Sequence, residues 1–152
     1  MTNMNFLPIQ TSLEANAAFI DHPDCQESLA MTLEYYKIIG YHFPWVCYFV
    51  EMDGEIVANA AFKGQPVAGR VEIAYGTMEQ YQHQGIGAAV CRKLVEIALA
   101  TDPGVQVTAR TLMEPNFSTR ILQKNGFQCL GIVNDPDDGE VWEWEYQGAL
   151  RP

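Results

Sequence analysis

Hydrophobic residues recur with a helical spacing in the middle of the chain. They lie three or four positions apart, which places them on one side of a helix: Ile86, Val90, Leu94 and Ile97. The preceding segment, 71–78, is rich in β-branched and aromatic residues and contains no proline, as is typical of a strand. The sequence therefore predicts a strand, a polar break at 79–84 and a helix that begins near Gly85.

Two helices and a strand are predicted before residue 45. A short strand over 6–10 is followed by Thr11 and Glu14, which have the spacing of a capping box and predict a helix that includes Phe19 and Ile20. A second helix is expected from about Gln26 to Gly40. Its apolar spacing gives it a buried side made of Leu29, Leu33, Tyr36 and either Tyr35 or Ile39.

The segments 45–52 and 55–63 have the composition of strands. They are joined by Asp53-Gly54, a dipeptide that favours a two-residue hairpin. We therefore expect two antiparallel neighbours, followed by a turn region at 64–69.

A strand over 105–112 follows the central helix. A strand, helix and strand in this order predict a crossover connection and a parallel pair. A short helix over 118–125 and strands over 127–133 and 141–146 complete the chain, with an acidic turn at 134–140. In the last strand Trp142, Trp144 and Tyr146 alternate with Glu143 and Glu145, which predicts an aromatic core face and a solvated charged face.

The start of the central helix has the chemistry of an anion site. The first N–H groups of a helix have no intrahelical acceptor, and glycines let phosphate oxygens approach them closely. The segment 82–87 is therefore a candidate phosphate cradle. It lacks the last position of a dinucleotide fingerprint, where Val90 stands, and the Gly-Lys-Ser/Thr of a P-loop. An isolated G-x-G also fits a tight turn with close helix packing.

Two sequence blocks resemble the GNAT superfamily of N-acetyltransferases. Residues 82–87, QHQGIG, are similar to its Q/R-x-x-G-x-G/A signature. Residues 111–127, TLMEPNFSTRILQKNGF, resemble the T-L-x-E-P-N-x-S-T-R-x-L-x-K-x-G-F run of the RimJ/RimL-like branch. The resemblance extends from about Val71 to Gly131 and implies an acetyl-CoA-dependent N-acetyltransferase.

The resemblance also implies a fold. We expect a single domain over 1–152 of the α/β (α+β) class, with the GNAT fold. That fold has a central mixed, mostly antiparallel sheet of about seven strands, a splayed parallel pair and about four helices. The first two helices would wall the acceptor site.

The resemblance assigns a set of residues to acetyl-CoA. Pantetheine would pair like an extra strand near Thr77 and Met78, and Asn116 would reach the pantetheine arm. The pyrophosphate would lie on the glycine loop, whose residues are Gln82, His83, Gln84, Gly85, Ile86, Gly87 and Ala88. Two blocks in the right order make this cofactor assignment specific.

Two residues are candidates for the catalytic chemistry. Glu72 matches the catalytic glutamate of the histone acetyltransferase members; burial in an apolar strand would raise its pKa and suit it to act as a base. The alternative is a structural glutamate paired with Arg70 or Arg110. Many family members carry a tyrosine acid where this chain has Leu122, so Ser118 is the fallback acid, with a helix N-cap as its alternative role.

Composition narrows the function further. The formal net charge of -10 argues against nucleic acid and favours a cationic amine acceptor. No apolar run reaches the length of a membrane span, and no secretory signal is recognised, so we expect a cytoplasmic protein without a membrane partner. The four cysteines and three histidines lack ligand spacing, which indicates reduced core thiols and no metal.

The acceptor is left open between a protein N-terminus and a small-molecule amine, and the oligomeric state between a monomer and a homodimer. The competing function is a non-catalytic acyl-CoA-binding or regulatory module on the same fold. Turnover with any amine discriminates between the two.

Overall fold

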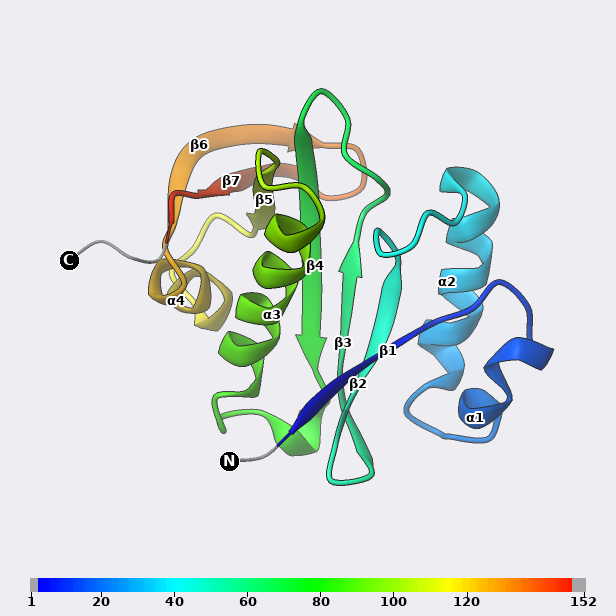
Figure 1. The fold of residues 1–152 in the computed structure, drawn as a ribbon. Helices are drawn as coiled ribbons and strands as arrows, with labels where there is room; N and C mark the ends of the chain where they lie inside the picture. The colour runs from blue at the N-terminus through cyan, green and yellow to red at the C-terminus, as the bar shows by residue number, and fades with distance from the viewer. Residues whose placement is uncertain (1–2, 149–152) are drawn as a thin grey trace.

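A computed structural model of the protein describes residues 3–148 as one seven-stranded sheet with helices on both faces (Figure 1). The strand order is β1-β2-β3-β4-β5-β7-β6. The strands are β1 (Met4–Pro8), β2 (Cys47–Met52), β3 (Glu55–Phe62), β4 (Arg70–Thr77), β5 (Gln106–Thr111), β6 (Phe127–Asp135) and β7 (Gly139–Tyr146). The expected mixed sheet with one parallel pair, β4 with β5, is confirmed. The ends of the domain expected over 1–152 lie outside the described residues.

Four α-helices cover the sheet: α1 (Ala17–Ile20), α2 (Gln26–Ile39), α3 (Ile86–Thr101) and α4 (Phe117–Lys124). The rings of Phe19 in α1 and Phe49 in β2 have centroids 4.7 Å apart, which places α1 on the Phe49 face. A Cβ added at Gly87 of α3 would lie 3.4 Å from Thr77 Oγ1, so α3 covers the opposite face, toward which Thr77 points. By the alternation of side chains along β4, Glu72 and Gly76 point to the α1 face.

The turn before α1 forms differently from the expected Thr11–Glu14 capping box. A 3-10 turn, Glu14–Asn16, precedes the helix, and Ser12 Oγ accepts the N–H of Ala15 at 3.2 Å. The fully buried Asn16 side chain accepts the Gln10 N–H at 2.8 Å and donates to the Gln10 and Ser12 carbonyls. The expected box is therefore wrong, because a buried amide satisfies the backbone of this turn.

The central hairpin is confirmed. Asp53 and Gly54 both have positive φ, 53° and 81°, as a two-residue turn matched to the twist of its strands requires. β2 and β3 pair antiparallel from Cys47 opposite Ala61 to Met52 opposite Glu55.

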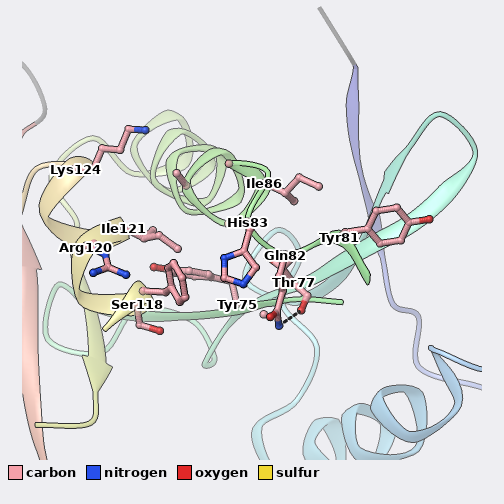
Figure 2. Close-up of a pocket in the computed structure, with 15 residues that line it drawn as sticks. Tyr75, Thr77, Tyr81, Gln82, His83, Ile86, Ser118, Arg120, Ile121 and Lys124 are labelled. Carbon is pink, nitrogen blue, oxygen red and sulfur yellow. Dashed lines mark hydrogen bonds between the residues drawn. The ribbon is translucent and has the colours of Figure 1, made fainter. Parts of the chain in front are cut away.

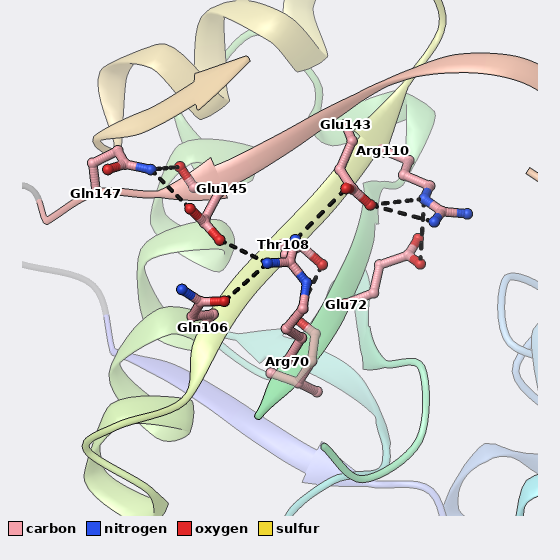
Figure 3. Close-up of polar contacts among 9 residues, drawn as sticks. Arg70, Glu72, Gln106, Thr108, Arg110, Glu143, Glu145 and Gln147 are labelled. Carbon is pink, nitrogen blue, oxygen red and sulfur yellow. Dashed lines mark hydrogen bonds and ion pairs between the residues drawn. The ribbon is translucent and has the colours of Figure 1, made fainter. Parts of the chain in front are cut away.

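The charged face of β7 is ion-paired, which corrects the expectation of a solvated outer face. Glu143 and Glu145 are only 17% and 16% exposed in their side chains. Arg70 contacts both carboxylates, and Arg110 contacts Glu143 at 3.3 Å (Figure 3). These contacts join β4, β5 and β7 on the sheet face opposite α3.

The N-cap of α4 is Asn116 rather than Ser118, which corrects the alternative role expected for the serine. The Asn116 side chain accepts the Thr119 N–H at 3.1 Å, and Thr119 Oγ1 accepts the Asn116 N–H at 2.9 Å. The helix begins one residue earlier than the sequence predicts, at Phe117. Ser118 is consequently free of a capping duty.

This cap gives a stability prediction. Asn116→Ala should lower the free energy of unfolding by about 1 kcal/mol. The Thr119 N–H loses its acceptor, and the hydrogen bond from the Asn116 N–H to Thr119 Oγ1 is weakened. Ser118→Ala, two residues along the same helix, is the matched control and should change it by a few tenths at most. Urea denaturation measures both, and an equal loss in the two variants would contradict the assignment of the cap.

Candidate active site

A cavity of about 450 Å³ lies between the end of β4, the glycine loop and α4 (Figure 2). Gln82, His83 and Ile86 form one wall and Ser118 and Ile121 the other. We call this the first cavity; its lining residues are Tyr75, Gly76, Thr77, Tyr81, Gln82, His83, Gly85, Ile86, Gly87, Ala88, Phe117, Ser118, Arg120, Ile121 and Lys124.

Free backbone donors line the glycine-loop wall. Gly85 is the N-cap of α3 at φ 80°, a left-handed conformation that favours glycine. It supplies no side-chain cap, and the Gly85 carbonyl accepts the N–H of Ala89. The N–H groups of Ile86, Gly87 and Ala88 therefore have no intrahelical acceptor at the positive end of a 16-residue helix. This wall suits an anion.

The opposite wall is basic. Arg120 and Lys124 line the cavity from α4, and no Asp or Glu within residues 3–148 lines it. The Arg120 guanidinium lies 4.7 Å from the centroid of the Phe117 ring, and the centroid of the His83 ring lies 4.6 Å from the same ring. In a chain with a formal net charge of -10, this concentration of positive charge selects a negatively charged ligand.

One edge of β4 is open beside the first cavity. The pairing of β4 with β5 ends at Glu72 and Thr108. The Met78 N–H donates to Val57 of β3, so the alternate residues Tyr75 and Thr77 direct their backbone groups toward β5. The Thr77 carbonyl accepts a side-chain N–H of Gln82 at 3.3 Å. An extended ligand with amide groups fits this edge.

Most of the residues that the sequence assigns to acetyl-CoA come together in the first cavity: Thr77, Gln82, His83, Gly85, Ile86, Gly87 and Ala88. Met78, Gln84 and Asn116 do not line it. Sequence reasoning missed four residues of α4: Phe117, Arg120, Ile121 and Lys124. Their spacing of three, four and seven positions, which places them on one helix face, is the signal that identifies them.

A second cavity of about 320 Å³ adjoins the first. Its lining combines charged side chains with an apolar wall: Lys63, Glu72, Ile73, Ala74, Arg110, Thr111, Leu112, Asn116, Ser118, Asp135, Asp138 and Val141. Among residues 3–148, Ser118 is the one residue that lines both cavities. It therefore stands at the boundary between the two spaces, and Glu72, where the pairing of β4 with β5 ends, lines the second cavity.

Glu72 lies in an ion-paired environment rather than the apolar one expected from its strand. Its Oε2 is 3.2 Å from Lys63 Nζ, and its Oε1 is 3.9 Å from Arg110 Nε. Its side chain is 20% exposed, toward the second cavity. Of the two arginines expected as structural partners, Arg110 is confirmed, and Arg70 pairs with the glutamates of β7 instead. Glu72 is thus open to a ligand and anchored by two cations.

α2 contributes Tyr35 to this region. Burial raises the pKa of Tyr35, Lys63 lowers it, and Cys47, Glu72 and Asp137 raise it further. The hydroxyl therefore lies within electrostatic range of the Lys63–Glu72 pair. This places Tyr35 of α2 near the Lys63–Glu72 pair of the second cavity.

Leu122, which stands where many family members carry a tyrosine acid, is buried away from both cavities. Leu122 is 1% exposed and belongs to the hydrophobic core, so it contributes nothing to either cavity. Tyr75 lines the first cavity, but burial, the Cys91 charge and the hydrogen bond with Cys91 all raise its pKa. The three buried cysteines also have raised pKa values, about 11 for Cys25 and Cys91, as expected for core thiols.

Comparison with known proteins decides the family. A sequence model described as the Acetyltransferase (GNAT) family matches residues 13–127. The chain belongs to this family. Its fold, with a splayed parallel pair and a glycine loop at the start of α3, is the GNAT fold. A comparison with curated protein sequences finds no match.

Solved structures share this GNAT fold at low identity. RimL, a ribosomal α-N-protein acetyltransferase in complex with coenzyme A, is 14% identical, with a TM-score of 0.69 over 99% of this chain and 97% of that one. The aminoglycoside acetyltransferase AAC(6')-Ib, in complex with an aminoglycoside and acetyl-CoA, is 17% identical, with a TM-score of 0.65 over 95% and 92%. A spermidine N-acetyltransferase chimera of Vibrio cholerae SpeG and hSSAT is 9% identical, with a TM-score of 0.69 over 94% of each chain.

None of the helices within residues 3–148 is long and apolar enough to cross a membrane. Within the same residues, His, Cys, Asp and Glu side chains form no group of three or more suited to a metal ion.

Asp135, which lines the second cavity, gives a pH prediction. The N–H of Asp137, Arg110 and the N–H of Asp138 donate to its carboxylate and hold its pKa below the usual value. Its stabilising effect is complete above the unfolded pKa of about 3.9 and disappears as pH falls through the lower folded pKa. Asp135→Asn should therefore reduce stability at pH 7, by an amount that shrinks below about pH 4.

Urea denaturation across this pH range measures the effect. Asp137→Asn is the control, since Asp137 is exposed in the same turn. A deficit in Asp135→Asn that is the same at pH 7 and at pH 3 would contradict the stated cause.

Proposed function

We propose that this protein is an acetyl-CoA-dependent N-acetyltransferase of the RimJ/RimL-like kind, which acetylates a primary amine by direct attack in a ternary complex. The observation that carries the proposal is that the two cavities share Ser118 as a wall residue and that Glu72, where the pairing of β4 with β5 ends, lines the second. Direct transfer requires two substrates to reach the same point from different sides. The first cavity has the chemistry for the cofactor and the second for the acceptor.

The first cavity offers groups that would bind the pyrophosphate and the pantetheine of acetyl-CoA. The free N–H groups of Ile86, Gly87 and Ala88 would hold the pyrophosphate, with Arg120 and Lys124 adding charge from the facing helix. The pantetheine amides would pair with the open edge of β4 at Tyr75 and Thr77. Met78, Gln84 and Asn116, which lie outside this lining, stay proposals from the resemblance.

The acceptor would react beside Glu72. Attack forms a bond between the amine nitrogen and the carbonyl carbon, breaks the carbon–sulfur bond and releases one amine proton. Glu72 lines the second cavity and would take that proton, directly or through water. The backbone N–H groups along the open β4 edge would stabilise the carbonyl oxygen. Ser118, at the junction, would lie beside the departing thiolate, whose low basicity reduces the need for an acid.

The competing function is a non-catalytic acyl-CoA-binding or regulatory module. Two observations favour it: Glu72 is held by Lys63 and Arg110, and the position of the usual tyrosine is a buried leucine. Release of free coenzyme A with any amine acceptor, followed by thiol detection, separates the two functions. Tight acetyl-CoA binding without turnover across a broad amine panel would establish the module.

Gly87 tests the cofactor cavity. A Cβ added there would lie 2.9 Å from Ile121 Cδ1, the movable end of a side chain that lines the cavity. Gly87→Val should therefore push Ile121 toward the pyrophosphate site and weaken acetyl-CoA binding by about 10-fold or more. Calorimetry on the folded variant measures the affinity.

A double-mutant cycle separates the steric effect from other causes. Ile121→Ala alone is the control, and Gly87→Val combined with Ile121→Ala should recover part of the lost affinity. Wild-type affinity in Gly87→Val would show that the ligand does not approach this loop.

Glu72 tests the chemical step. Glu72→Gln should lower turnover about 100-fold or more with little change in acetyl-CoA affinity, because the amide cannot accept the proton. Glu143→Gln, which removes another carboxylate contact of Arg110, is the control for network damage. Equal losses of turnover in Glu72→Gln and Glu143→Gln would show that Glu72 has a structural role and does not act as the base.

A further inference from the structure

The carboxylates inside the second cavity are already paired. Glu72 contacts Lys63 and Arg110, and Asp135 contacts Arg110 and two backbone N–H groups. The remaining carboxylate in the lining, Asp138, is exposed. The Glu72 side chain is 20% exposed and can face one ammonium, whereas the Asp135 side chain is 5% exposed and is held by Arg110 and the turn. The second and later ammonium groups of a polycationic acceptor would have no free buried carboxylate among residues 3–148 to pair with in this cavity.

Lys63 has more N–H donors on its ammonium than the ion pair with Glu72 uses. Its ammonium carries three N–H donors, and within residues 3–148 its one ion pair is with Glu72, at 3.2 Å. Its side chain is 38% exposed and lines the second cavity. Burial alone would lower the pKa of Lys63, but Glu72 and then Asp135 raise it above the ordinary value. A fixed cation with unused donors is thus available to an anionic group of the acceptor.

The spacing of the Lys63–Glu72 pair suits a ligand that carries both charges on neighbouring atoms. An α-amino acid has its ammonium and carboxylate on the same carbon, a separation similar to the 3.2 Å between Nζ and Oε2. The ammonium of the amino acid can then face the Glu72 carboxylate while its carboxylate faces the Lys63 ammonium. The cavity volume of about 320 Å³ is that of a small-molecule site. Leu112 and Val141 supply apolar surface for the rest of the ligand.

We propose that the acceptor is a small amino-carboxylate, a primary amine with an adjacent carboxylate, and that Lys63 binds this carboxylate while Glu72 receives the amine. The assignment rests on the proposed function, because it names the acceptor for the second cavity. Lys63 is a specificity residue in this scheme. It selects against decarboxylated amines, polyamines and aminoglycosides.

The test compares α-amino acids with the amines that share their side chains and lack only the carboxylate. For each pair, the ratio of the two kcat/KM values is measured by thiol release. Wild-type protein should favour the amino acid by about 10-fold or more, the range of a hydrogen bond between charged groups. Lys63→Met should remove this preference, and Lys63→Arg should keep it. Taking the ratio cancels any common effect of Lys63 on Glu72.

Lys37→Met is the matched control, since Lys37 pairs with Glu34 on the exposed surface of α2. Its ratio should equal that of the wild type. Faster turnover of polyamines or aminoglycosides than of every amino acid would overturn the proposal, as would a preference for amino acids that persists in Lys63→Met.

A binding measurement keeps this test separate from that of the proposed function. With coenzyme A present, an amino acid should raise the Tm of the wild type more than its decarboxylated amine does, and Lys63→Met should abolish the difference. If no amine is acetylated, the proposed function fails, whereas these shifts still decide whether Lys63 is a carboxylate site. Equal Tm shifts from the amino acids and their amines in the wild type would refute it.

Discussion

The site depends on the parting of two parallel strands. β4 stays paired with β3 through Thr77, but its pairing with β5 spans only three residue pairs and ends at Glu72. A parallel pair requires a crossover connection, here α3, and that helix begins where β4 ends. The same topology brings the start of α4 to the gap, because α4 follows the end of β5. Free helix amides, an open strand edge and a carboxylate are thus gathered at one place by the chain connections alone.

Charge pairing holds the sheet together beyond the gap. Arg70 links β4 to β7 and to Gln106 in β5, and Arg110 links β5 to Glu143, Asp135 and Glu72. Such half-buried pairs add little net stability, but removing one partner leaves the other uncompensated. Glu72 belongs both to this network and to the second cavity. The network fixes the direction of the carboxylate without closing it to solvent.

Local patterns predict local structure well in this chain. The Asp53-Gly54 hairpin, the helix from residue 86 and the parallel pair all follow from residue spacing, because turn chemistry and one apolar face decide them. Contacts between segments distant in sequence are what spacing cannot supply. Lys63 and Glu72 form an ion pair because the β3–β4 turn brings them together. Before α1, the buried side chain of Asn16 bonds the backbone of Gln10, where the sequence predicts a cap by Thr11. The cap at Asn116 was within reach of the sequence, since Asn and Thr three residues apart form a capping box.

The most direct test of this account is a crystal structure of the protein with coenzyme A. We expect the pyrophosphate on the amides of residues 86–88, the pantetheine along the open edge of β4 and the thiol sulfur in contact with Ser118 at the junction of the cavities. A sulfur atom directed away from the second cavity, or a pyrophosphate bound anywhere other than the start of α3, would contradict the claim that the two cavities serve one transfer reaction.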